Sequence, residues 1–216
     1  MSLIRILLLA LPFALGSAAA QAAPNLLSNG SFETPNIAGN NYTFYGAGST
    51  AVTGWTVVGA DTQLTRTEFV PAAHGNQWID LTGQYGYNKG LRSDAVATAV
   101  GQRYTLSFDL GDYYLPGFQT STLAVSINGA PQTLFTNIYQ GGVMDWERMS
   151  FDWVADSASA QITFLGVQNG SLSNDAVIGL DNVVFEAVSV VPEPSTYAMM
   201  LAGLALLGAR MRRKQR

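Results

Sequence analysis

The stretch 103–110 reads Arg-Tyr-Thr-Leu-Ser-Phe-Asp-Leu, and large apolar side chains alternate along it with mostly polar ones. Because successive side chains of a β-strand point to opposite faces, Tyr104, Leu106, Phe108 and Leu110 fall on the same face. A strand with this pattern buries one face in a core and leaves the other near solvent. The stretch therefore predicts a strand of a layered β-protein.

The alternation continues on both sides of this stretch. Leu123–Ile127 alternates in the same way, Asn128-Gly129 supplies the two residues of a tight hairpin turn, and Thr133–Phe135 returns. Glycine-rich turn signals separate further predicted strands, which are Leu26–Phe32, Val52–Val58, Gln77–Leu81, Leu91–Val100, Arg148–Val154, Ala160–Val167 and Val177–Val188.

About ten short strands with such turns between them predict an all-β fold, an antiparallel β-sandwich. The intervening segments are too short for crossover helices, which argues against an α/β fold. The sandwich is expected to occupy residues 23–189 as one domain.

The N-terminus has the pattern of a signal peptide. Arg5 gives a positive charge, an apolar run follows it, and small residues follow the run. The sequence Ala20-Gln21-Ala22 fits the signal-peptidase pattern, so we expect a signal peptide of residues 1–22 and cleavage between Ala22 and Ala23.

The C-terminus carries a second apolar stretch. Pro192-Glu193-Pro194 leads into an apolar helix expected over 196–209, and a basic tail follows at 210–216. A helix of fourteen residues is about 21 Å long and the hydrocarbon core about 30 Å thick, so this predicted transmembrane helix spans the bilayer only if basic side chains snorkel or the bilayer thins. Basic clusters stay on the cytoplasmic side, which places the sandwich across the membrane.

The predicted domain is acidic and has no cysteine. Residues 23–189 hold five basic and fourteen acidic residues, a net charge of −9. Such a domain is a poor partner for nucleic acid, whose phosphates need lysine and arginine. Without cysteine, disulfides and cysteine-ligated zinc are excluded.

The C-terminal segment, 190–216, resembles the PEP-CTERM sorting signal of Gram-negative bacteria. The resemblance rests on Pro192, Glu193 and Pro194 followed by the apolar stretch and the basic tail. It implies processing by an exosortase after signal peptidase. The expected route passes through an inner-membrane-anchored intermediate to the cell surface or the extracellular matrix.

Motifs spread along residues 25–183 resemble choice-of-anchor C proteins and carbohydrate-binding modules with a galactose-binding-like jelly roll. They are Asn25 to Glu33, Gly54-Trp55-Thr56-Val57, Gly75 to Gly83, Val100 to Leu110, and Gly179 to Val183. The resemblance implies a β-sandwich that often binds polysaccharide and that can hold a structural calcium ion.

Glu33 and Asp181 are the candidate calcium ligands. They lie near opposite ends of the domain sequence, and the first and last strands of a jelly roll can be neighbours. With backbone carbonyls they could surround a hard cation, because calcium takes six to eight oxygen ligands. The alternative is that Glu33 caps the first strand and Asp181 hydrogen-bonds a turn.

Tyrosines in glycine-rich loops are the candidate sugar-binding residues: Tyr85, Tyr87, Tyr113 and Tyr114. Aromatic faces pack against the C–H groups of pyranose rings. The alternative is that these side chains only cover the ends of the sandwich. Tyr42 and Tyr45 form a third loop group.

No catalytic motif stands out. The one histidine, His74, has no Gly-x-Ser-x-Gly partner, and no pair among the fourteen acidic residues is singled out for glycoside hydrolysis. We therefore expect a non-catalytic, polysaccharide-binding surface protein. Two alternatives remain: an adhesive or structural surface protein that binds other proteins, and a glycoside hydrolase.

Overall fold

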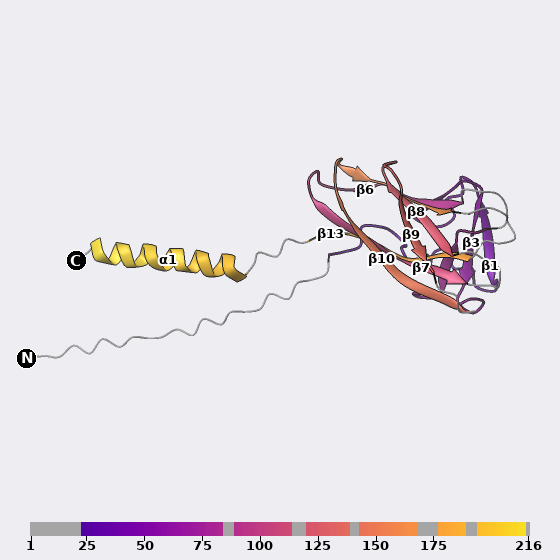
Figure 1. Cartoon of the computed structure of the whole chain (residues 1–216), viewed down its shortest axis with the longest axis horizontal. Helices are drawn as coiled ribbons and strands as arrows, with labels where there is room; N and C mark the ends of the chain where they lie inside the picture. Colours follow the sequence, from indigo (N-terminus) through magenta and orange to yellow (C-terminus); the bar gives the residue numbers. More distant parts are fainter. Residues whose placement is uncertain are drawn as a thin grey trace, which may run out of the picture. The chain divides into compact units, whose positions relative to one another are not determined.

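The computed structural model describes residues 23–83, 89–113, 120–138, 143–167, 177–188 and 194–214. Ala23–Ser189 form the first compact unit, and the described residues 194–214 lie outside it. The first unit is built from antiparallel sheets (Figure 1), which confirms the predicted all-β sandwich.

The larger sheet, among the residues that the structure describes, has six strands in the order β1-β3-β4-β13-β7-β10. The central position of β13, the last strand, between β4 and β7 brings distant segments of the sequence together. The bounds are β1 (Tyr42–Gly46), β3 (Asp61–Arg66), β4 (Gln77–Asp80), β13 (Val177–Ala187), β7 (Arg103–Tyr113) and β10 (Met144–Val154).

The second sheet has five strands among the described residues, in the order β2-β5-β12-β8-β9, and β6 and β11 form a separate pair. The bounds are β2 (Trp55–Val58), β5 (Gly90–Ser93), β12 (Ile162–Val167), β8 (Ser121–Ile127), β9 (Thr133–Asn137), β6 (Val96–Ala97) and β11 (Ser159–Ala160).

The core lies between the two large sheets. The predicted inward face of β7 is buried along its whole length, including Leu106, Phe108 and Leu110. The Phe108 ring lies 5.3 Å from the Phe164 ring of β12, and Phe164 lies 6.0 Å from Trp55 of β2. The Phe108–Phe164 contact ties the two sheets together, while the Phe164–Trp55 contact lies within the five-stranded sheet.

The hairpin predicted at Asn128-Gly129 is confirmed. It joins β8 to β9, and both residues have positive φ, 53° and 72°. Only the mirror-image turns need positive φ at both central positions, and their twist matches that of the strands.

The predicted first strand, Leu26–Phe32, is wrong. Asn29 and Phe32 have positive φ, 52° and 56°, which breaks the extended backbone. The segment instead lies along β13, where Leu26 N–H donates to Phe185 O and Val183 N–H donates to Gly30 O, each at 2.8 Å. Gly30 is required there, because a Cβ would lie 2.0 Å from Val183 O.

Two strands were not predicted, and two were predicted too long: Val52–Val58, of which only Trp55–Val58 is β2, and Leu91–Val100. β1 and β3 were not predicted because apolar and polar residues do not alternate clearly in these segments. Leu91–Val100 is divided between β5 and β6, which pair with different partners: β5 with β2 and β12, and β6 with β11. The sequence therefore did not predict the edge of the six-stranded sheet that β1 and β3 form.

The C-terminal helix α1 spans Pro194–Lys214, a longer segment than the 196–209 predicted. Among the described residues, no helix combines the length and the apolar character needed to cross a membrane. The structure therefore does not support the predicted transmembrane helix, since the apolar stretch is short and runs directly into Arg210, Arg212 and Arg213.

Candidate functional site

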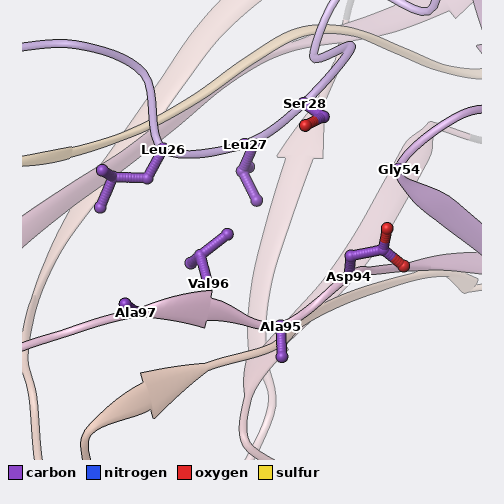
Figure 2. Close-up of a pocket in the computed structure, with 8 residues that line it drawn as sticks. All are labelled: Leu26, Leu27, Ser28, Gly54, Asp94, Ala95, Val96 and Ala97. Atoms are coloured by element: carbon purple, nitrogen blue, oxygen red, sulfur yellow. The ribbon is translucent and has the colours of Figure 1, made fainter.

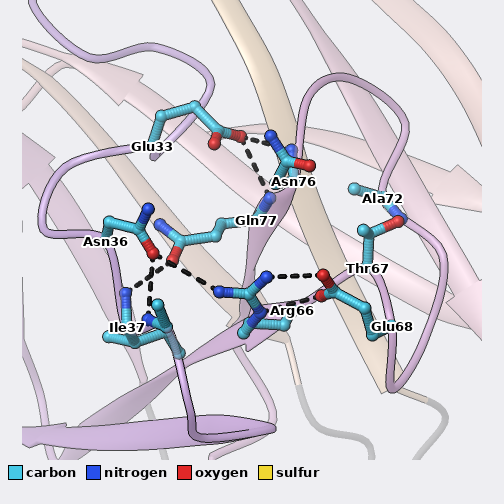
Figure 3. Close-up of polar contacts among 10 residues, drawn as sticks. Glu33, Asn36, Ile37, Arg66, Thr67, Glu68, Ala72, Asn76 and Gln77 are labelled. Carbon is cyan, nitrogen blue, oxygen red and sulfur yellow. Dashed lines mark hydrogen bonds and ion pairs between the residues drawn. The ribbon is translucent and has the colours of Figure 1, made fainter.

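Glu33 follows the turn that opens the domain and reaches the loop between β3 and β4. Its Oε1 accepts hydrogen bonds from the N–H groups of Asn76, at 2.7 Å, and Gln77, at 3.0 Å (Figure 3). Gly75 makes room for this carboxylate, because a Cβ there would lie 2.3 Å from Oε1 and its φ is +71°. Glu33 thus fastens this loop to the start of the domain.

Asp181 contacts the same loop from β13. Its Oδ2 accepts from His74 N–H at 2.7 Å, and its Oδ1 accepts from Asn182 N–H at 2.6 Å. The side chain is fully buried, and this burial, with a smaller contribution from the charge of Asp109, raises its pKa to about 7. Both candidate calcium ligands therefore converge on residues 74–77.

These contacts match the hydrogen-bonding alternative, but they also leave carboxylate lone pairs available to a cation. In the described ranges, no group of three or more acidic or histidine side chains is placed to hold a metal ion. Calcium at Glu33 and Asp181 would therefore need carbonyl oxygens or water for most of its shell. The calcium site stays a prediction.

Asp109 lies opposite Asp181 on the neighbouring strand β7. Arg148 of β10 donates to Asp109 Oδ1 at 3.2 Å, and Asn182 Nδ2 donates to Asp109 Oδ2 at 3.0 Å. Arg148 also donates to Asn182 O, at 2.7 Å, and to Ser107 Oγ, at 2.7 Å. Of the two neighbouring carboxylates, one is engaged by a guanidinium and the other is buried, so neither is an exposed acid or base.

The predicted tyrosine platform is only partly placed by the structure. Tyr113 is the last residue of β7 and is half-buried, opposite Met144 and Val177 in register. Tyr85, Tyr87 and Tyr114 lie outside the described residues, as do Ala22, Pro192 and Glu193.

An exposed aromatic surface lies elsewhere, at the edge of the six-stranded sheet. We call Tyr42, Phe44 and Phe69 the edge aromatic surface. Tyr42 is 44% exposed and Phe69 51% exposed, and their ring centroids lie 5.5 Å apart with the planes inclined by 51°. Phe44 lies 5.5 Å from Tyr42. Tyr45 turns to the other face of β1 and packs against the core.

Arg66 and Glu68 lie close to Phe69 in the sequence, and they form hydrogen bonds with each other and with Asn36 (Figure 3). Arg66 donates to both carboxylate oxygens of Glu68, at 2.8 and 2.5 Å, and to Asn36 Oδ1 at 3.4 Å. These hydrogen bonds to Arg66 hold the pKa of Glu68 at about 2, so the carboxylate stays ionised. The sequence singled out none of these residues or Phe69, because they lie in loops or at the end of a strand that was not predicted.

Two tryptophans fix the loop that carries Phe69. Trp78 Nε1 donates to Val70 O at 2.9 Å, and Trp146 Nε1 donates to Pro71 O at 3.0 Å. Their rings meet edge to face with centroids 5.5 Å apart. Trp78 is buried but lies under this loop, outside the main core cluster. The aromatic surface therefore stands on a rigid support.

A hollow of about 420 Å³ lies where the N-terminal segment passes the start of β6 (Figure 2). Leu26, Leu27 and Val96 give it apolar walls, and Asp94 brings a carboxylate to its rim. It holds few groups able to fix the orientation of a ligand, so it is a weaker candidate site than the edge aromatic surface.

Comparison with known families decides what kind of domain this is. The family described as "Protein of unknown function (DUF642)" matches residues 25–185. The chain belongs to the DUF642 family. The PEP-CTERM protein-sorting motif matches residues 190–214, which confirms the resemblance of the C-terminal segment and marks this DUF642 protein for export and surface sorting.

One curated relative is halomucin of Haloquadratum walsbyi (strain DSM 16790 / HBSQ001), which is 30% identical over 175 residues. The match covers 78% of this chain but 2% of halomucin, so the DUF642 chain spans a very small fraction of that protein's length.

Among solved structures, a cyclase from Fischerella sp. TAU resembles the chain with a TM-score of 0.56 and 16% identity, over 80% of this chain and 100% of the other. TmCBM61, solved with β-1,4-galactotriose, gives a TM-score of 0.46 and 14% identity, over 77% and 100%. At such identities the likeness to the cyclase concerns the fold, which agrees with the sandwich of this DUF642 domain.

Proposed function

We propose that this exported, surface-sorted protein binds polysaccharide through its DUF642 sandwich, without catalysis, at the cell surface or in the extracellular matrix. The observation that carries the proposal is the edge aromatic surface. Two large rings, 44% and 51% exposed, lie in contact, one on β1 and the other on a fixed loop, where simple solubility would favour polar side chains.

The arrangement suits a sugar chain. Ring faces pack against the C–H face of a pyranose, and the two ring centroids lie 5.5 Å apart, so one sugar chain can contact both rings. Glu68 and Asn36 offer hydrogen-bonding groups at the rim for hydroxyls.

The absence of catalysis belongs to the proposal. It is supported by the engagement of Asp109 with Arg148 and by the burial of Asp181, since hydrolysis of a glycoside needs a carboxylic acid and a second carboxylate that both reach the substrate. We also propose a calcium ion with Glu33 and Asp181 as ligands. It would hold the β3–β4 loop, which carries Phe69. Exosortase processing supplies the route to the surface.

A binding assay tests the proposal directly. In affinity electrophoresis or pull-down with the exopolysaccharide of the producing cell, Tyr42→Ala and Phe69→Ala should each weaken binding. A contact of about 1 kcal/mol per ring corresponds to roughly fivefold. Leu134→Ala, which truncates a residue 61% exposed on β9, is the matched control and should bind normally.

Two outcomes would contradict this placement. If Tyr113→Ala weakens binding while Tyr42→Ala and Phe69→Ala do not, the sugar site is at the predicted tyrosine loops. If no polysaccharide is bound and the same two rings are needed to hold another protein, the chain is the adhesive protein that the sequence left as an alternative.

A further inference from the structure

Lys89 is a buried lysine that joins the two large sheets. It directly precedes β5, and Gly166 N–H of β12 donates to its carbonyl oxygen at 2.8 Å. Its side chain is 2% exposed and crosses to the six-stranded sheet. There Nζ donates to the carbonyl oxygen of Thr82, which follows β4 closely, and lies 3.8 Å from Oδ1 of Asp61, the first residue of β3.

A second acid lies beside this pair. Asp80 ends β4 opposite Gln63, two residues from Asp61, so the side chains of both aspartates point to the same face of the sheet. Asp80 is buried and accepts the N–H of Thr82 at 2.7 Å. Burial raises its pKa, and the charge of Lys89 opposes that rise. An amine, a carboxyl group and a buried acid are thus gathered in one place.

Gly83 lets these groups approach each other. A Cβ at this position would lie 2.7 Å from Asp61 Oδ1 and 3.0 Å from Lys89 Cδ. Any side chain would therefore separate Asp61 from the lysine stem. The glycine has φ +55°, which a larger residue would adopt only with strain.

We propose that Lys89 and Asp61 form an intramolecular amide bond between Nζ and Cγ, with Asp80 as the proton donor. Both reacting side chains are shielded from water, 2% and 13% exposed, and the reaction takes place between the neutral amine and the neutral carboxylic acid. The Nζ lone pair attacks Cγ, the nitrogen loses its proton, and the departing hydroxyl takes a proton and leaves as water. The balance is one amine and one carboxylic acid giving one amide and one water, with no oxidant.

The bond would serve a domain that cannot make disulfides, because the chain has no cysteine. It closes the loop between residues 61 and 89 and fastens β3 of one sheet to the start of β5 in the other. A cross-link of this kind stabilises mainly by restricting the unfolded chain. The inference does not depend on polysaccharide binding.

Intact-mass spectrometry of the full mature protein, purified from the exporting cell and denatured, tests the proposal. The expected mass is lower, by one water molecule, than the mass calculated from the sequence of the processed chain. Fragmentation should show the Asp61 peptide joined to the Lys89 peptide. A wild-type protein at its full sequence mass overturns the proposal, and so does a cross-link that joins Lys89 to Asp80.

Variants sharpen the result. Lys89→Met should restore the full calculated mass, while the matched control Arg92→Met, at an exposed position of β5, keeps the deficit. In Asp61→Asn the same attack releases ammonia, so the deficit should change from that of water to that of ammonia. A deficit that persists in Lys89→Met contradicts the assignment. The wild-type measurement stands even if a variant fails to fold.

Discussion

Asp112 is an inward-facing aspartate on β7 with a fully buried side chain. Ser121 Oγ donates to its Oδ1 at 2.9 Å, while its Oδ2 has no hydrogen-bond partner among the residues that the structure describes. Burial, with a smaller contribution from Asp145, raises its pKa above the usual 3.8. A buried carboxylate with an unsatisfied oxygen destabilises the fold when it is ionised.

The sign of its pH dependence follows from proton linkage. Between pH 3.8 and the raised pKa, the folded protein binds more protons than the unfolded chain, so the free energy of unfolding falls as the pH rises. Asp112→Asn should remove this loss and raise the melting temperature at neutral pH. Asp156→Asn removes the same charge from an exposed site and is the control. Equal shifts in both variants would mean that only net charge matters.

Calcium binding is also tested at the residue scale. If one ion binds at Glu33 and Asp181, at 100 times its Kd it stabilises the native state by about 2.7 kcal/mol. For a domain of this size each kcal/mol is worth roughly 2–4 °C, so EDTA should lower the melting temperature by about 5–11 °C. Asp181→Ala should abolish this response.

Magnesium is the control for calcium, because the domain's charge of −9 attracts any divalent cation. Magnesium screens charge similarly but prefers a small octahedral shell and keeps its waters. Equal stabilisation by both ions would argue against a specific calcium site.

At the scale of elements, β7 and β13 carry two glycines on their outer face, and the Trp146 ring lies over both. A Cβ on Gly111 would lie 2.2 Å from Met144 Cε and 2.8 Å from the Trp146 ring, and a Cβ on Gly179 would meet the same two side chains. Trp146 in turn holds Pro71 and the loop that carries Phe69. The glycines therefore determine how closely that loop lies on the sheet.

Gly111→Ala should displace Trp146 and destabilise the domain by about 1–3 kcal/mol, the usual range for overpacking. At 2–4 °C per kcal/mol the melting temperature should fall by several degrees. Gly46→Ala in β1 is the matched control, because a Cβ there meets nothing within 4 Å. Trp146 fluorescence reports the displacement; an unchanged spectrum and melting temperature would refute this role.

The sequence predicts well those strands in which one face is buried, because apolar and polar residues then alternate. β7 and β8 are examples, since apolar residues recur at every second position. The Leu26–Phe32 segment looked similar, but backbone conformation at Asn29 and Phe32 overrides the pattern. The neighbouring ends of a jelly roll led us to pair Glu33 with Asp181, but the loop at residues 74–77 that both contact was not predicted. Phe69 was not, because its exposure depends on where Trp78 and Trp146 hold its loop.

At the scale of the whole molecule, export is expected to depend on the signal peptide, and delivery to the surface on the sorting motif. Replacing Pro192-Glu193-Pro194 with three alanines should leave export unchanged, because the signal peptide is intact, while the processing enzyme loses its recognition motif. The protein should then remain in the cell envelope instead of reaching the surface. Cell fractionation with surface labelling measures the distribution, and normal surface delivery of the triple variant would show that the motif is dispensable.

The first and last segments of the sandwich are hydrogen-bonded to each other along a seam. Asn25 Nδ2 donates to Val183 O and its Oδ1 accepts from Phe185 N–H, beside the backbone bonds of Leu26 and Gly30 to β13. Mechanical tension between the ends of the domain would therefore load this seam first, and its hydrogen bonds would break in succession, as in the opening of a zipper. The two large sheets would carry little of the force until these hydrogen bonds had broken. In a surface protein under shear, the N-terminal segment would therefore detach from β13 before the sheets unfold.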